Sequence, residues 1–201
     1  LAFQRAKLTF EEELASSEIS YSIVRPTAFF NSLSGQMERL KVGKPFLVFG
    51  DGQLTACKPI SDRDLARFLV SCLTDPEKKN KTLPIGGPGP ALTPKEQGAR
   101  LAEVLGVEPK LRRVPPGFLK LMGRVIASPA KLLRIRGMRF VAKAEMARIG
   151  HYYATESMLV WDGARYDADG TPEFGSDTLK GHYEALARGE IADQRGEHAV
   201  F

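Results

Sequence analysis

The stretch from Tyr21 to Phe30 joins a short strand pattern to a loop of small and aromatic residues, an arrangement that can place a ligand beside a sheet. Pro26 cannot donate a hydrogen bond to a sheet and restricts the backbone of Arg25, so we expect the strand to end there. Because ligands in open α/β folds bind beyond the carboxyl ends of strands, we expect the next residues to form one wall of a cofactor site. This candidate wall consists of Pro26, Thr27, Ala28 and Phe29.

A lysine and an aromatic residue share one side of the first predicted helix. Apolar residues recur at spacings of three and four, which predicts a helix with one buried stripe formed by Phe3, Ala6, Phe10 and Leu14. Lys7 lies one turn after Phe3 and therefore projects from the same side. Lys7 is either a functional ammonium group beside this stripe or an ordinary solvent-facing lysine.

Residues 151–153, His-Tyr-Tyr, are candidates for acid–base chemistry, because histidine titrates near neutral pH and a phenol can donate a proton. At the end of a helix pattern, the same residue types are also typical of packing and surface contacts. His182 and His198 have no companion ligands, and Cys57 and Cys72 lack metal-ligand spacing. We therefore expect no metal site and two reduced thiols.

Composition and charge describe an ordinary globular unit with an uneven charge distribution. The 201 residues are 43% hydrophobic and 26% charged, and the net charge is +5. Eleven Lys or Arg residues and one acid lie between residues 110 and 148, which indicates either an anionic ligand or surface nearby or a solvated helix face. No apolar run approaches membrane-spanning length. Because the sequence opens inside a helix pattern at Leu1, it is expected to be the C-terminal part of a longer protein.

The middle of the chain alternates between strand and helix patterns. A strand pattern at Phe46–Phe49, the turn residues Gly50–Gly52 and a second strand pattern at 54–60 together predict a β-hairpin. Further helices are expected over residues 31–40, 64–73, 116–126, 140–146 and 176–186, and further strands over 82–85, 111–114 and 158–161.

Two short motifs mark a helix start and a turn. Thr93 and Glu96 fit a capping box with Pro94 at the first helical position, so a helix is expected to begin there and to end at Gly106. The glycine cluster from Gly86 to Pro90 lacks the Lys-Ser or Lys-Thr pair of a phosphate-binding loop and is therefore predicted to be a turn.

Five stretches in this order resemble the C-terminal half of an atypical short-chain dehydrogenase/reductase of the NmrA-like branch. Within that branch, they are most similar to the reductases that act on a vinyl group of chlorophyll precursors. The stretches are Phe3–Lys7, Ser22–Phe30, Cys57–Ser61, Leu83–Gly89 and Tyr152–Leu159. The resemblance runs from Leu1 to about Glu190.

The resemblance implies an α/β fold that is the C-terminal half of an NAD(P)-binding Rossmann-like fold, with a smaller α+β substrate-binding region. The first strands and the glycine-rich loop of such a fold would lie ahead of Leu1. Residues 1–90 are expected to belong to the NADPH-binding domain, with its hairpin at 46–60. Residues 91–190 are expected to form a mostly helical substrate-binding region, and residues 191–201 a tail.

The same resemblance implies NADPH-dependent reduction of the 8-vinyl group of divinyl chlorophyllide a, or of divinyl protochlorophyllide, to an ethyl group. Lys7 matches the lysine of the superfamily's Tyr-x-x-x-Lys pair, and in the superfamily this lysine binds the nicotinamide ribose. The resemblance therefore implies that Lys7 is both a catalytic and a cofactor-binding residue. Phe3 stands at the tyrosine position and cannot donate a proton, which disfavours alcohol oxidation but permits hydride addition to a conjugated carbon.

The resemblance implies that backbone groups of Pro26, Thr27 and Ala28 meet the nicotinamide amide; the alternative is that these residues form an ordinary strand-to-loop turn. Phe29 is either a core residue or packs near the nicotinamide or the flat macrocycle. The alternative is a non-catalytic dinucleotide-binding sensor or assembly factor, which Phe3 also permits.

The expected partner is a tetrapyrrole, with peripheral membrane association and no nucleic acid. The expected location is a plastid in an alga or plant and the cytoplasm in a photosynthetic bacterium. The present stretch alone is expected to be inactive.

Overall fold

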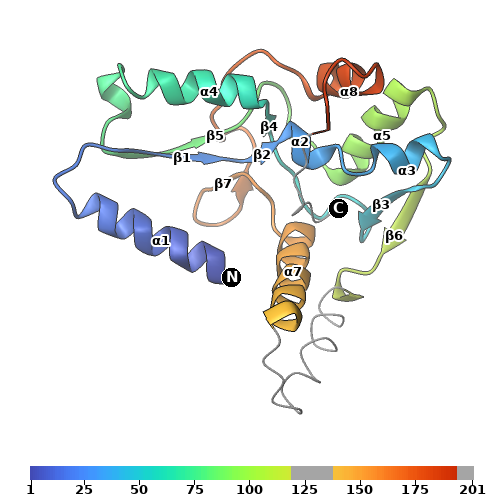
Figure 1. Cartoon of the computed structure of the whole chain (residues 1–201), viewed down its shortest axis with the longest axis horizontal. Coiled ribbons are helices and arrows are strands. Elements are labelled where there is room, and N and C mark those ends of the chain that lie inside the picture. The colour runs from blue at the N-terminus through green and yellow to red at the C-terminus, as the bar shows by residue number, and fades with distance from the viewer. Residues whose placement is uncertain (119–137, 194–201) are drawn as a thin grey trace, which may run out of the picture.

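Parallel strand pairs form the framework of the chain in a computed structural model that describes residues 1–118 and 138–193 (Figure 1). Three of the four strand pairs among these residues are parallel, which requires crossover connections and confirms the α/β class. The parallel pairs are β1 (Ser22–Pro26) with β5 (Lys81–Ile85), β2 (Ala28–Phe29) with β4 (Pro59–Ile60), and β3 (Phe46–Phe49) with β6 (Leu111–Val114). The antiparallel pair is β7 (Val160–Trp161) with β8 (Tyr166–Asp167).

The helices of the described residues vary from one turn to five. They are α1 (Ala2–Ala15), α2 (Phe30–Leu33), α3 (Met37–Lys41), α4 (Asp62–Ser71), the 3-10 turn η1 (Pro76–Lys78), α5 (Pro94–Leu105), α7 (Met138–Thr155) and α8 (Leu179–Ala187). The start of α5 is as predicted, because the hydroxyl of Thr93 and the carboxylate of Glu96 form the capping box. Gly106 ends the helix with a φ of +65°, a conformation that favours glycine.

The predicted hairpin at 46–60 is wrong. β3 pairs in parallel with β6, and the only strand within 54–60 is β4, which pairs with β2. Cys57 exchanges backbone hydrogen bonds with Leu92, at 3.2 and 2.8 Å, so the backbone that would have faced β3 is already occupied. The local pattern was that of a strand, a turn and a strand, but the pairing is set by partners more than 30 residues away.

Three helix predictions also require correction, and one lies outside the described residues. The helix expected over residues 31–40 is instead two short helices, α2 and α3, separated by residues 34–36. α7 continues through Gly150 to Thr155, so residues 151–153 lie within a helix and do not follow one.

α1 has no buried residue, and Phe10 is 64% exposed, so its apolar face is not a buried stripe among the described residues. Spacing predicts which residues share a face but not whether the face is buried: Phe3 and Leu14 are half-buried, whereas Ala6 is exposed like Phe10. Figure 1 shows α1 and α4 on opposite sides of the β1–β5 pair. The predicted helix at 116–126 falls mostly outside the described residues.

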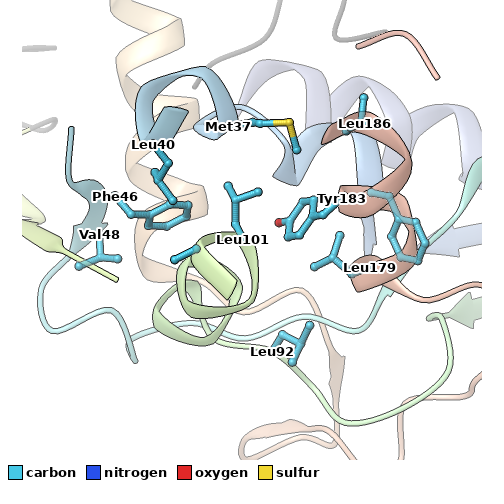
Figure 2. Packing of buried hydrophobic residues seen from close by; sticks show 11 residues of the cluster. Met37, Leu40, Phe46, Val48, Leu92, Leu101, Leu179, Tyr183 and Leu186 are labelled. Carbon is cyan, nitrogen blue, oxygen red and sulfur yellow. The ribbon is translucent and has the colours of Figure 1, made fainter. Parts of the chain in front are cut away.

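The larger hydrophobic core joins elements from both sides of residue 90 (Figure 2). Leu101 of α5 and Tyr183 of α8 are fully buried at its centre, and the Tyr183 hydroxyl donates to the carbonyl of Leu33 at 3.1 Å. The other members are Phe30, Met37, Leu40, Phe46, Val48, Leu92, Ala102, Leu179 and Leu186. A second cluster of Ile60, Phe68 and Ile85 lies under α4. The division of the chain at residue 90 is therefore not a division between two cores and remains a proposal about binding roles.

No described helix is both long and apolar enough to cross a membrane.

Candidate functional site

The carboxyl ends of the central strands meet at the loop predicted to form a cofactor wall. β1 ends at Pro26, and the chain then leaves its partner β5 and joins β4 through β2. The loop therefore begins at the carboxyl end of a parallel strand, the edge of a sheet at which α/β folds bind ligands. Ala28 is buried and Phe29 is 37% exposed, so an aromatic side chain faces outward at the strand ends.

Thr27 is held firmly by backbone groups of the neighbouring strands. Its N–H donates to the carbonyl of Ile85 at 3.0 Å, and its hydroxyl donates to the carbonyl of Lys58. Neither hydrogen is therefore available to a ligand. If the wall binds a nicotinamide amide, other backbone groups of Pro26–Phe29 must make the contacts.

Phe3 and Lys7 project from the same side of α1, as predicted. The Lys7 ammonium lies 5.9 Å from the centroid of the Phe3 ring, within the range of a cation–π interaction, while the Lys7 residue is exposed. The ammonium thus has a defined position on α1 and keeps its N–H donors accessible.

An ion pair that the sequence did not indicate connects α1 to the loop. Glu11 lies one turn after Lys7, and its carboxylate accepts hydrogen bonds from Arg25, the residue before Pro26. The hydrogen bond from Arg25 to Glu11 raises the pKa of the Arg25 guanidinium above its ordinary value. Among the described hydrogen bonds and ion pairs, none joins Lys7 directly to Pro26–Phe29, so the two parts of the predicted site are linked through this pair.

A second missed feature is a buried lysine. Lys58 is 5% exposed and its ammonium lies 2.5 Å from Glu173, whose carboxylate also accepts the N–H of Gly89 at 3.1 Å. The hydrogen bond from Lys58 lowers the pKa of the Glu173 carboxyl, and that from Gly89 adds to the effect. A lysine inside an apolar run was the available signal, but its partner lies 115 residues away.

The glycine cluster has a packing role. A Cβ on Gly86 would lie 2.6 Å from the Cβ of Lys58, and one on Gly87 would overlap the carbonyl oxygen of Pro59. The carboxyl end of β5 therefore approaches β4 at a distance that only glycine allows. This close approach accounts for the two glycines without a phosphate ligand.

A hollow of about 260 Å³ opens where the candidate wall leads into α2. Within it, His182 is half-buried, its Nε2 lies 3.1 Å from the hydroxyl of Ser34, and burial lowers its pKa. The hollow is lined by Phe30, Asn31, Ser61, Asp62, Arg63, Asp177, His182, Ile191 and Ala192. Within residues 1–118 and 138–193, no group of three His, Cys, Asp or Glu side chains gathers to hold a metal ion.

Three tyrosines, two at the end of α7 and one in β8, lie near the same strands. The rings of Tyr152 and Tyr153 meet edge to face, and burial raises the pKa of Tyr153. The Tyr166 hydroxyl donates to Glu156 at 2.7 Å, which raises the pKa of Tyr166 to about 12. Met158 donates its N–H to the carbonyl of Ala56 at 2.9 Å, so this cluster is attached to the chain just before Lys58. Because the pKa values of Tyr153 and Tyr166 are raised, both phenols keep their protons at neutral pH. An acid–base role for residues 151–153 stays a prediction.

Comparison with known proteins confirms the resemblance inferred from the five stretches. The chain is 48% identical over 209 aligned residues to a chloroplastic divinyl chlorophyllide a 8-vinyl-reductase of Zea mays, and 49% identical to that of Oryza sativa subsp. indica. Each alignment covers 100% of the chain and 51% of the relative. The corresponding Arabidopsis thaliana protein is 48% identical over 202 residues, which is 96% of the chain and 48% of the relative. The chain thus spans about half the length of the curated relatives it matches. No family model matches it.

Solved structures of reductases and an epimerase share the fold. An isoflavone reductase has a TM-score of 0.58 at 14% identity and covers 90% of this chain and 57% of its own. AtPrR2 with NADP+ and (+)pinoresinol has a TM-score of 0.56 at 14% identity, covering 90% and 55%. A nucleoside-diphosphate-sugar epimerase from Staphylococcus aureus has a TM-score of 0.52 at 18% identity, covering 86% and 55%. These likenesses confirm a partial Rossmann-like α/β fold.

Proposed function

We propose that the whole protein reduces the 8-vinyl group of divinyl chlorophyllide a, or of divinyl protochlorophyllide, to an ethyl group with NADPH. The observation that carries this proposal is 48–49% identity along the entire chain to plant divinyl chlorophyllide a 8-vinyl-reductases. The fold adds support, because the predicted wall begins at the carboxyl end of the parallel strand β1. The relatives are named chloroplastic, which supports a plastid location; the cytoplasm is proposed if the source is a photosynthetic bacterium.

The residues present suit a nicotinamide dinucleotide. Lys7 is exposed beside Phe3, with its N–H groups free to donate to ribose hydroxyls, and Phe29 offers an exposed ring at the strand ends. Solved neighbours include one with NADP+ bound. When bound, NADPH supplies a hydride that adds to a carbon conjugated with the macrocycle. In this proposal residues 1–90 bind the cofactor, residues 91–190 bind the tetrapyrrole, and residues 191–201 form a tail.

The chain's own part in the reaction is binding, orientation and proton supply. Lys7 holds the ribose and thereby fixes the distance of the nicotinamide from the substrate, and the wall Pro26–Phe29 limits the nicotinamide on one side. Phe3 has no acidic hydrogen, so the proton that completes the reduction comes from water, Lys7 or a tyrosine. Tyr153, whose pKa is raised by burial, is one candidate among these tyrosines.

The test is spectroscopic. The full-length protein is incubated with divinyl chlorophyllide and NADPH, and a blue shift of the Soret band with a mass gain of two hydrogens is expected. Omission of NADPH is the control. If bound NADPH can be demonstrated but the Soret band does not move, the catalytic proposal fails and the non-catalytic dinucleotide-binding alternative takes its place. Peripheral association with membranes, proposed from the basic stretch, is tested by sedimentation with anionic vesicles.

A further inference from the structure

Lys58 is a buried cation at the junction of three segments. A buried ammonium is costly unless it is paired, and the Glu173 carboxylate at 2.5 Å is its counter-charge. The backbone carbonyl of Lys58 accepts the hydroxyl of Thr27 and also the N–H of Gly87, the latter at 3.1 Å. One residue thus binds the candidate wall and the glycine segment through its backbone, and a distant acid through its side chain.

Glu173 belongs to a strap, residues 171–177, that forms a parallel bridge with Gly86, the residue directly after β5. On either side of Glu173, the strap exchanges backbone hydrogen bonds with Gly86. Gly86 donates to the carbonyl of Pro172 at 2.8 Å, and Phe174 donates to the carbonyl of Gly86 at 2.9 Å. The ion pair with Lys58 and the hydrogen bond from the N–H of Gly89 then fix the Glu173 side chain between these two residues.

The other end of the strap has anchors of its own. Asp64 is fully buried and accepts the N–H groups of Ser176 at 2.9 Å and Asp177 at 2.8 Å. Arg63 donates to the Asp177 carboxylate at 2.9 Å. Removal of Lys58 or Glu173 would therefore take away the side-chain anchor at one end of the strap, where only its backbone hydrogen bonds to Gly86 remain, while the anchors at the other end are unchanged.

We infer that Lys58, through its ion pair with Glu173, is a positioning residue for the dinucleotide site, setting the place of Thr27 and hence of the wall Pro26–Phe29. Lys58 is not a catalytic residue, because its ammonium is buried and paired with Glu173. The inference rests on the proposed function, since it assumes that the wall meets the nicotinamide.

The test measures NADPH affinity in the full-length protein by the fluorescence of the reduced nicotinamide, together with kcat, KM and thermal unfolding. Lys58→Met is expected to raise the Kd for NADPH at least tenfold. Lys58→Arg keeps a positive charge and is expected to retain most of the affinity for NADPH. The matched control is Arg63→Met, which removes an ion pair at the other end of the same strap. It is expected to change the Kd less than twofold, although both variants lower the unfolding temperature.

Glu173→Gln keeps the shape of the side chain. Because Glu173 is partly exposed, this substitution gives a second variant if Lys58→Met does not fold. Its Kd is expected to rise at least threefold with kcat/KM falling in proportion. The inference is overturned if the folded variants bind NADPH as the unaltered protein does, or if Arg63→Met has an equal effect. If the unaltered protein itself binds no NADPH, the proposed function fails, so the two failures are distinguishable.

Discussion

At the scale of single residues, the decisive contrast is between Lys7 and Lys58. Lys7 is exposed and has the face of the Phe3 ring as its recorded contact, so its donors remain accessible. Lys58 is buried and paired with Glu173. A lysine that contacts a cofactor needs the first environment, and a lysine that holds the backbone in place needs the second.

Replacing Lys7 by alanine tests the first role. If the ammonium binds the ribose as a charged donor, Lys7→Ala should weaken NADPH binding and activity at least tenfold, about 1.4 kcal/mol. Lys41→Ala is the control, because Lys41 is a helix lysine paired with Glu38 on α3. Equilibrium binding and initial rates on the full-length protein are the measurements. Unchanged affinity and rate would show that Lys7 is an ordinary solvated lysine.

The pH dependence of stability tests the second role. The folded-state pKa of Glu173 lies below its ordinary value, chiefly because of Lys58, so its ionised form is favoured in the folded state. The resulting stability is fully present above the unfolded-state pKa, near 4.3, and is lost as the pH falls through the lowered folded-state pKa. The unfolding temperature of the protein should therefore exceed that of Glu173→Gln at pH 6, and the difference should shrink below about pH 4. A difference that is constant from pH 6 to pH 3 would contradict the assignment.

At the scale of elements, the glycines after β5 set how closely two strand ends approach. Gly87→Ala places a methyl group against the carbonyl oxygen of Pro59, and because that oxygen belongs to backbone it cannot move aside cheaply. We expect a loss of about 3 kcal/mol in the free energy of unfolding. Gly117→Ala is the control, since its Cβ would meet no described atom within 4 Å, and it should stay within about 0.5 kcal/mol. The measurement is urea denaturation of both variants. If Gly87→Ala and Gly117→Ala unfold at the same urea concentration, the close approach of the two strand ends is refuted.

Local patterns predicted what is local. The capping box at Thr93, the end of β1 at Pro26 and the shared helix side of Phe3 and Lys7 depend on residues within a few positions of one another, and all three are found. The pairing of β3 with β6 and the ion pair of Lys58 with Glu173 depend on residues far apart. A sequence pattern specifies a strand or a lysine, but the partner is chosen by how the whole chain packs. The sequence therefore indicated the wall of the site, whereas the strap behind it required the structure.

At the scale of the whole molecule, packing is unevenly distributed. α5 lies in the larger core with Leu101 fully buried, whereas α1 has no buried residue and exposes both Leu8 and Phe10. Since the chain spans about half the length of its relatives, we propose that segments of the longer protein cover α1 and complete the dinucleotide site around Lys7. Residues 1–201 alone are then expected to lack turnover.

Hydrogen exchange can compare residues 1–201 with the protein at the full length of its relatives. Amides of α1 should exchange quickly in the shorter chain and become protected in the longer one, because an uncovered helix opens locally at low cost. Amides of α5 provide the internal control and should be similarly protected in both, since their core is already formed by residues of this chain. NADPH should slow exchange in α1 only in the longer protein, because only there is the proposed dinucleotide site around Lys7 complete. Equal protection of α1 in both chains would mean that its exposed face needs no cover, and the proposed completion of the site by other segments would be wrong.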